Sequence, residues 1–456
     1  MVLRRDIMDN NVIVGKYTLE SLTMGMYTNP FIIYREYIQN STDAIDEAVR
    51  KGIINHENTY INIIINKTES SIIIEDNGIG VSLKDAPEVL LNIGKSNKNL
   101  GINKGFRGIG RLGGLSYCDS VIFETSYYGE DTSSIITFDA ARLNRLLIPG
   151  EFESYTLSDV IKEVTNIQYK KESPEKHYFR VILKNVNKKY NLLEFDKVYS
   201  YIKQVAPVPF DTNKFKYADD IYKKLSELKI DWVNYNIFLG ESRDSLKQIY
   251  KPYKTRFYTD VSRKVIDSFE GVHFYEITDD YNGKLIALVW YGKCKLLGTV
   301  LDEEVKGLRV RKSGIMIGDR FLLNPIFKEE RFNGWVQGEV LVFDDNIIPN
   351  ARRDDFEKND AYILLIEKLK NIAECISNDI RNASKQRSKQ VNNMSENKNV
   401  TSNDNITKEI ISKLDFIIQK ATMKDSKLLE QIGKVLKVEL DANKAERILK
   451  KIENIV

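Results

Sequence analysis

One polar stretch decides the fold of this chain, Arg35-Glu36-Tyr37-Ile38-Gln39-Asn40-Ser41-Thr42-Asp43-Ala44, and it lies in a segment with the pattern of a helix. Residues three and four apart share a helix face, so Glu36, Asn40 and Asp43 lie on one face. A carboxylate can activate water, and an amide oxygen is a suitable ligand for a hard metal ion. Taken alone, such a face is more often a solvated polar surface. The motifs that follow in the chain must therefore decide whether it belongs to a functional site.

The composition is ordinary for a protein of several domains. The chain has 456 residues, 42% of them hydrophobic and 29% charged, which suffices for sizeable cores. A net charge of +3 argues neither for nor against nucleic acid. The three cysteines are widely spaced and the three histidines isolated, which indicates a reducing compartment and no zinc site. Because no signal peptide or membrane-spanning apolar stretch is apparent, we expect a cytoplasmic protein without membrane contact.

A second motif follows two predicted strands. Residues 60–66 and 71–75 are rich in β-branched residues and indicate a hairpin. The second strand leads directly into Asp76-Asn77-Gly78-Ile79-Gly80. A carboxylate at a strand end can accept a hydrogen bond from an exocyclic amine such as adenine N6, and adjacent glycines let the backbone approach a flat ring. Taken alone, this motif is more often a simple turn.

The third motif is the glycine-rich segment Gly105-Phe106-Arg107-Gly108-Ile109-Gly110-Arg111-Leu112-Gly113-Gly114. Successive glycines allow backbone N–H groups to converge on a phosphate, and Lys104, Arg107 and Arg111 add positive charge. The spacing is not that of a Walker loop. A flexible loop without a ligand explains this motif equally well when it is considered by itself.

The order of the three motifs resembles that of the GHKL ATPase superfamily, and most closely its ninety-kilodalton heat-shock chaperone branch. The helix motif of those chaperones reads Arg-Glu-Leu-Ile-Ser-Asn-Ser-Ser-Asp-Ala-Leu-Asp, on which residues 35–46 nearly superimpose. The resemblance implies an α/β fold: an amino-terminal GHKL (Bergerat) α/β sandwich, an α/β middle domain and a short helical tail. It also implies ATP and Mg²⁺ as cofactors.

The resemblance gives each matching residue a role. Glu36 would be the general base, Asn40 would ligate Mg²⁺, and Asp43 would lie near the ribose and phosphates. Asp76 would bind adenine N6. An ATP lid would lie between the second and third motifs. The remaining nucleotide contacts and the start of the lid would involve Gly78, Gly80, Asn92, Lys95, Gly105, Arg107, Gly108, Ile109, Gly110 and Arg111.

The first domain departs from the chaperone pattern in three places. Arg111 stands where the chaperones carry Phe, and it could add a phosphate contact. The string Gly105-Phe106-Arg107-Gly108 is closer to the MutL branch. The chaperones also place a Thr on a late strand of the site, whereas the corresponding stretch Tyr178-Phe179-Arg180-Val181-Ile182-Leu183 has no hydroxyl at that position. A nearby side chain or water would have to replace that hydrogen bond.

A second resemblance lies in another part of the chain. Residues 308–319 are similar to the chaperones' Leu-Tyr-Val-Arg-Arg-Val-Phe-Ile-Met-Asp strand, and Ile347-Ile348-Pro349-Asn350-Ala351-Arg352-Arg353-Asp354 to their Leu-Pro-Leu-Asn-Ile-Ser-Arg-Glu loop. That loop supplies an arginine to the γ-phosphate, which implies Arg353, with Arg352 as the alternative. A cation from a second domain would neutralise charge on the transferred phosphoryl group.

Composition and motifs together suggest four regions. We expect a GHKL domain at 1–190, a middle domain with the arginine loop at 191–383, a flexible linker at 384–405 and a helical tail at 406–456. The tail could contact a partner or fold back as a cap. The other expected elements are a helix at 30–51, strands at 119–127, 134–139, 178–185, 285–291, 308–317 and 338–343, and a helix at 360–384.

The expected function is that of a chaperone-like ATPase. The resemblance implies dimerisation with ATP, at least transiently, and a protein client or partner. One alternative is a clamp on nucleic acid of the MutL or MORC kind, in a bacterial defence system, which the MutL-like string and the basic cluster Arg309-Arg311-Lys312 keep open. Another alternative is a scaffold that holds nucleotide without turnover, which the intact Glu36 and Arg353 disfavour.

Overall fold

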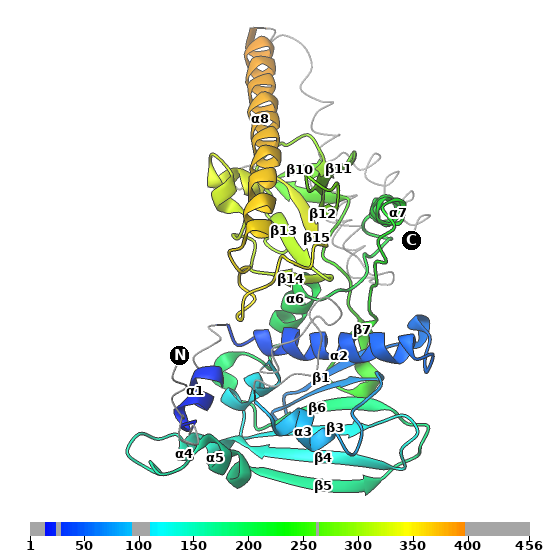
Figure 1. Ribbon diagram of the computed structural model, residues 1–456. Helices are drawn as coiled ribbons and strands as arrows, with labels where there is room; N and C mark the ends of the chain where they lie inside the picture. Colours follow the sequence, from blue (N-terminus) through cyan, green and yellow to red (C-terminus); the bar gives the residue numbers. More distant parts are fainter. Residues whose placement is uncertain (1–13, 24–28, 94–109, 261–263, 397–456) are drawn as a thin grey trace, which may run out of the picture.

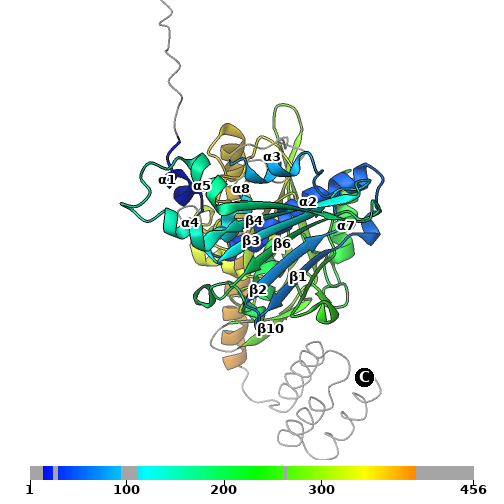
Figure 2. The same ribbon diagram turned by 90° about the horizontal axis from the view of Figure 1, so that it is seen from below.

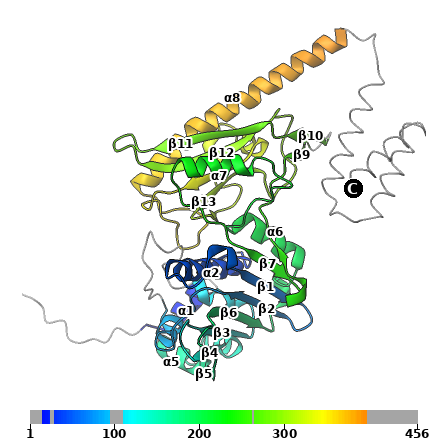
Figure 3. The same cartoon turned by 90° about the vertical axis from the view of Figure 1, so that its right-hand side faces the viewer.

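The chain folds into two stacked domains, each built on its own β-sheet (Figure 1). The computed structural model describes residues 14–23, 29–93, 110–260 and 264–396. The long helix α2 (Ile32–Arg50) lies between the first sheet and the second domain (Figures 1 and 3). The predicted α/β class is confirmed. Among the described helices, none has the length and apolar character that a membrane span requires.

The first domain contains a mixed sheet in the order β5-β4-β3-β6-β2-β1-β7-β8. The predicted hairpin forms its middle, because the isoleucines of β1 and β2 pair antiparallel, with Ile63 opposite Ile74. The strands are β1 (Ile61–Asn66), β2 (Ser71–Asp76), β3 (Ser120–Ser126), β4 (Thr132–Asp139), β5 (Thr165–Lys171), β6 (Tyr178–Lys184), β7 (Ile237–Gly240) and β8 (Lys247–Gln248).

Helix α2 (Ile32–Arg50) covers this sheet with an apolar face. Its buried side chains include Ile33, Ile38 and Ile45, and they pack into the same core as Ile63 and Ile74. Helices α1, α4 and α5 gather at one end of the sheet (Figures 1 and 2). The other helical segments of this domain are α1 (Tyr17–Thr23), η1 (His56–Asn58), α3 (Ala86–Leu91), η2 (Gly110–Ser116), α4 (Ala140–Leu146), α5 (Leu157–Val164), η3 (Lys188–Tyr190), α6 (Phe195–Val205) and η4 (Arg243–Ser245).

The first sheet includes strands that lie beyond the predicted domain end at residue 190. Strand β7 pairs parallel with β1, with Ile61 opposite Ile237, and β8 extends the same sheet. After α6 the chain therefore leaves the first domain. It returns to the first sheet with β7 and β8, and the later strands belong to the second domain. Ile237 and Leu239 are buried in the first core, which explains why this short segment joins the sheet.

The second domain has a five-stranded sheet in the order β11-β12-β15-β13-β14 and a separate β9–β10 hairpin. Its strands are β9 (Arg256–Thr259), β10 (Val265–Ser268), β11 (Gly271–Thr278), β12 (Leu285–Lys293), β13 (Gly307–Lys312), β14 (Ile315–Ile317) and β15 (Gln337–Val342), with short η5 (Asn324–Ile326) and η6 (Glu330–Trp335) between them. The single strand predicted at 308–317 is in fact a β13–β14 hairpin, because Ser313 and Gly314 adopt positive φ values of 51° and 77°.

Helices cover both faces of this second sheet. Helix α7 (Ala218–Glu227) packs against the face with Trp290, and α8 (Asp360–Glu396) against the face with Val289 (Figure 3). Helix α8 continues past the predicted end at 384, so the predicted linker does not begin there. The reason is local: residues 381–396 are polar but contain no Gly or Pro that would break a helix. The rest of that linker and the predicted tail lie outside the described residues.

A buried ionic cluster lies where the domains meet. Lys251 Nζ donates to Glu339 Oε2 at 2.6 Å, and Arg311 Nε donates to Glu339 Oε1 at 2.5 Å. Arg311 also donates to the carbonyl oxygen of Gln204 at the end of α6, at 2.7 Å. All three charged side chains are almost fully buried. The cluster therefore joins β13 and β15 of the second domain to the segment that leaves the first.

Candidate functional site

Helix α2 places the predicted polar face at the boundary between the domains. Glu36 and Asp43 are buried, with exposed fractions of 8% and 4%, and Asn40 is half-buried. The helix forms because residues 32–50 contain neither Gly nor Pro and present a continuous apolar face to the sheet. The opposite face is thereby held towards the second domain (Figure 3).

The end of the glycine-rich motif contacts Glu36 directly. Gly110 begins η2, and a Cβ atom there would lie 2.3 Å from Glu36 Oε2. A side chain at this position would push the Glu36 carboxylate away, so glycine lets the backbone approach the carboxylate as it stands. The structure thus brings the first and third predicted motifs into contact.

The second domain also reaches Glu36. Arg353 lies in the loop between β15 and α8, and its Nε atom is 3.4 Å from Glu36 Oε1. Arg353 is 8% exposed, whereas Arg352 is exposed. Of the two predicted arginines, it is therefore Arg353 whose side chain contacts the first domain.

The backbone at Arg353 is held in an unusual conformation. Its φ is 56°, a left-handed value that non-glycine residues rarely adopt. Two hydrogen bonds secure it: Arg353 N donates to Asn350 O at 3.1 Å, and Gly318 N donates to Arg353 O at 2.9 Å. Strained backbone that persists in this way is typical of functional sites.

Arg35 is a contact that the motif analysis did not single out. Its guanidinium donates to Arg352 O at 3.0 Å and to Arg353 O at 3.3 Å, and it lies 3.4 Å from Glu36 Oε1. Arg35 therefore ties α2 to the arginine loop through two carbonyl groups. The sequence offered two signals for Arg35, its position next to Glu36 and the Arg at the matching position of the chaperone motif, and neither reveals a contact in another domain.

Asp76 ends β2 in a fully buried position. Burial raises the pKa of its carboxyl to about 7, while the nearby Ser41 hydroxyl and the N–H groups of Gly78 and Phe179 act in the opposite direction. Oδ1 accepts from Gly78 N at 2.9 Å. Oδ2 is buried without a hydrogen-bond partner among the described residues. A buried acceptor of this kind fits the exocyclic amine that the sequence predicted.

Gly78 and Gly80 are required by protein contacts. A Cβ at Gly78 would lie 2.6 Å from Ala44 Cβ on α2, and a Cβ at Gly80 would lie 2.0 Å from Ser126 O. Ile79 N also donates to Ala44 O at 3.1 Å. These contacts fix the loop after Asp76 against α2. The Asp76 carboxyl group is therefore held between the end of β2, which precedes it, and this loop, which follows it. Whether either glycine lies beside a ring stays a prediction.

Arg111 makes contacts that the sequence did not predict. Its Nε donates to Leu90 O at 3.3 Å, and its terminal nitrogen donates to Asn92 O. Burial lowers the pKa of the guanidinium to about 10, so it remains charged at neutral pH. The guanidinium therefore holds the carboxyl end of α3, and the phosphate contact expected for it stays untested. Asn92 is itself exposed at that helix end.

Several predicted residues lie outside the described residues, namely Lys95, Gly105, Arg107, Gly108 and Ile109. Within the described part of the chain, no group of three or more His, Cys, Asp or Glu side chains is placed to hold a metal ion. The assignment of Mg²⁺ to Asn40 therefore remains a prediction.

The basic cluster that kept a nucleic-acid clamp open is buried. Arg309 and Arg311 are 3% and 2% exposed. Arg309 donates to Glu303 O at 2.6 Å, and Lys312 donates to Asp344 O at 2.7 Å. These side chains are committed inside the second domain and offer no basic surface for a phosphate backbone.

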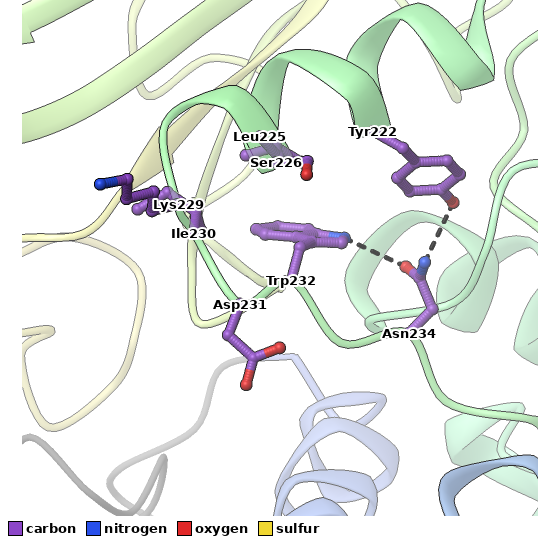
Figure 4. Close-up of a pocket in the computed structure, with 8 residues that line it drawn as sticks. All are labelled: Tyr222, Leu225, Ser226, Lys229, Ile230, Asp231, Trp232 and Asn234. Atoms are coloured by element: carbon purple, nitrogen blue, oxygen red, sulfur yellow. Dashed lines mark hydrogen bonds between the residues drawn. The ribbon is translucent and has the colours of Figure 1, made fainter.

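A cavity of about 540 Å³ lies apart from this site, beside the end of α7 (Figure 4). Its walls are ordered by hydrogen bonds, since Trp232 Nε1 donates to Asn234 Oδ1 at 3.2 Å and Asn234 Nδ2 donates to Tyr222 Oη at 3.0 Å (Figure 4). None of the predicted site residues lines it.

Comparison with known proteins identifies the first domain. A family model described as histidine kinase-, DNA gyrase B-, and HSP90-like ATPase matches residues 28–168. The match spans α2, Asp76 and Gly110, the residues assembled above. The amino-terminal domain is a GHKL ATPase domain. The resemblance predicted from the three motifs is therefore confirmed.

Among curated proteins, the GHKL domain and the region after it are similar to bacterial proteins named chaperone protein HtpG. The protein of Clostridium perfringens is 34% identical over 133 residues, which are 26% of this chain and 21% of that protein. Those of Alkaliphilus metalliredigens and Clostridium botulinum are 26% and 25% identical over 66% and 80% of this chain. The chain spans 48% and 57% of their lengths.

Proposed function

We propose that this chain is a chaperone-like ATPase, in which the GHKL domain binds ATP and the arginine loop of the second domain completes the hydrolytic site. The observation that supports this most strongly is the 3.4 Å separation between Arg353 Nε and Glu36 Oε1. A cation delivered from one domain to a carboxylate of another is an arrangement suited to phosphoryl transfer. Matches to chaperones that extend over both domains support the same proposal.

Adenine recognition falls to Asp76. Its Oδ2 is buried and lacks a partner among the described residues, and an amine N–H from adenine N6 would satisfy it. Ser41 stands close to the carboxyl and is buried on α2. We propose that Ser41 supplies the hydroxyl that is missing from the β6 position.

The phosphate end of the site is formed by α2 and η2. Asn40 would hold Mg²⁺ through its amide oxygen, and the ion would screen charge on the phosphates. Asp43, one turn along α2, would lie beside the ribose and phosphates. The backbone of Gly110 approaches Glu36 closely, which leaves N–H groups as the natural phosphate donors in this segment.

Hydrolysis then depends on two side chains. Glu36 orients the attacking water and accepts its proton as the bond from water oxygen to phosphorus forms. Arg353 neutralises the charge that gathers on the transferred phosphoryl group. Arg35 holds the loop that carries Arg353. Turnover is therefore coupled to docking of the two domains.

We further propose that ATP promotes dimerisation and that the resulting cycle acts on a protein client. The support is the name that the relatives share and their similarity over both domains. The burial of Arg309 and Arg311 gives no support to a clamp on DNA.

The first test separates binding from hydrolysis. Glu36→Ala should bind ATP with unchanged Kd and hydrolyse it at a rate reduced by about 10²-fold or more, the scale of a lost catalytic base. Asp76→Asn should lose ATP binding. If Glu36→Ala lost binding and turnover together, the general-base assignment would be wrong.

The second test asks which macromolecule stimulates the ATPase. An unfolded model protein should increase the steady-state rate, and double-stranded DNA should not. Stimulation by DNA that falls steeply with salt would instead indicate a nucleic-acid clamp.

A further inference from the structure

Tyr37 and Arg111 connect α2 to η2 beside Glu36. Tyr37 is 2% exposed, and its hydroxyl donates to Arg111 O at 3.1 Å and accepts from Gly114 N at 3.1 Å. A Cβ at Gly114 would lie 2.5 Å from this hydroxyl oxygen, so the contact needs glycine at that position. The Tyr37 hydroxyl therefore both donates to and accepts from the backbone of η2.

Arg111 continues this connection through its side chain. While its carbonyl accepts from Tyr37, its guanidinium donates to Leu90 O at 3.3 Å and to Asn92 O. The backbone of one residue is thus fixed to α2 and its side chain to the end of α3. Cationic donors stabilise the free carbonyl groups at a helix end.

These contacts flank the approach of Gly110 to the general base. Glu36 and Tyr37 are neighbours on α2, and they contact Gly110 and Arg111, which are neighbours on η2. Two adjacent contacts prevent η2 from rotating or sliding along α2. Both Tyr37 and Arg111 also differ from the chaperone pattern, which has Leu and Phe at these positions, and the two changed residues contact one another.

We propose that Tyr37 and Arg111 are positioning residues, which together hold Gly110 against the Glu36 carboxylate and so set the direction of the general base. This inference rests on the proposed ATPase function. It also replaces the expectation that Arg111 contacts phosphate. A displacement of about 1 Å at a reacting group can cost about 10²-fold in rate, so the loss of one positioning hydrogen bond should be measurable.

The test compares two buried tyrosines on the same helix. Tyr37→Phe removes the hydroxyl that binds η2. Tyr34→Phe is the matched control, because Tyr34 is fully buried and its hydroxyl donates to Leu192 O at 2.6 Å rather than to the backbone of η2. Tyr37→Phe should lower kcat for ATP by about tenfold with Kd for ATP unchanged, whereas Tyr34→Phe should lose comparable thermal stability and keep kcat.

Two substitutions test whether Arg111 acts through its cationic side chain. Arg111→Gln should lower kcat without weakening ATP binding, and Arg111→Lys, which retains a cationic donor, should recover part of the rate. If Arg111→Gln bound ATP more weakly with kcat unchanged, Arg111 would be a contact to the phosphates, and the positioning role would be overturned. Equal kcat in wild type and Tyr37→Phe, or equal losses in the two tyrosine variants, would overturn it as well. A wild-type chain without ATPase activity would overturn the proposed function itself, and this inference with it.

Discussion

Arg353 Nε and Glu36 Oε1 lie 3.4 Å apart, although one belongs to the loop before α8 and the other to α2 of the GHKL domain. Both residues are only 8% exposed. The contact places a cation from the second domain at the carboxylate expected to activate water. Hydrolysis should therefore report on how the two domains dock as well as on nucleotide binding.

The first prediction concerns the choice between the two arginines. Arg353→Ala should lower kcat by about 10²-fold or more, because a charge that stabilises the phosphoryl group is lost. Arg352→Ala is the natural control, since the Arg352 side chain is exposed and the contact with Arg35 uses its carbonyl group. Steady-state ATPase assays decide the matter, and a larger loss in Arg352→Ala would move the catalytic role to Arg352.

The second prediction concerns Arg35. Arg35→Ala should release the loop at 350–353, because it removes donors to two of its carbonyl groups. Amide hydrogen exchange should then rise in peptides from this loop, and kcat should fall. Arg50→Ala, at the exposed end of α2, should change neither quantity. Unchanged exchange in Arg35→Ala would show that the loop is held by other contacts.

The third prediction concerns pH and Asp76. Burial raises the pKa of this carboxyl to about 7, so it is increasingly protonated as the pH falls below 7. An amine donor favours the carboxylate, so binding must release a proton there, and ATP affinity should fall by up to about tenfold per pH unit. Calorimetry across about pH 5.5 to about pH 8.5 measures this dependence. A Kd that does not vary over this range would exclude the ionised Asp76 as the acceptor.

The raised pKa of Asp76 changes folding stability with pH in the opposite direction from ATP affinity. Because the pKa of Asp76 is higher in the folded protein than in the unfolded chain, its contribution to folding is complete below about pH 4 and is lost as the pH rises through about 7. Asp76→Asn should therefore flatten the unfolding free energy in this range, even though the variant binds no nucleotide.

The fourth prediction concerns the buried cluster at the domain boundary. Burial lowers the pKa of Lys251 to about 7, with the charge of Arg311 acting in the same direction. The unfolded chain then binds the extra proton between about pH 7 and about pH 10, so this contribution to stability rises with pH over that range. Lys251→Met should remove this pH dependence, while Glu339 keeps Arg311 as its charged partner.

Glu339 provides the contrast to Lys251. Glu339→Gln leaves two buried cations without their carboxylate and should destabilise the protein by about 3–5 kcal/mol. Denaturant unfolding of the two variants measures the difference. A Glu339→Gln variant as stable as wild type would show that the cluster contributes nothing to the connection between the domains.

Much of the site was predictable because its motifs are local. Glu36, Asn40 and Asp43 share a helix face by spacing alone, and Asp76 follows directly from the isoleucine-rich strand. The approach of Arg353 could be inferred only from resemblance, since no local pattern connects residues so far apart in the chain.

The remaining features depend on contacts that are not local in sequence. The return of Ile237 and Leu239 to the first sheet is a parallel pairing with β1, and nothing near those residues indicates it. Helix α8 is longer than its polar composition predicts, because the absence of Gly and Pro from residues 381–396 allows the helix to continue. The roles of Arg35 and Arg111 depend on carbonyl groups that only the folded chain brings near.

The most direct test of the account is a double-mutant cycle on Glu36 and Arg353, measured by single-turnover hydrolysis of ATP. If the two side chains act together on one reaction, Glu36→Gln, Arg353→Ala and the double variant should have similar rates, so the losses should be far from additive. Losses that multiply in the double variant would mean that Arg353 acts independently of Glu36, which would contradict a site completed by docking of the second domain.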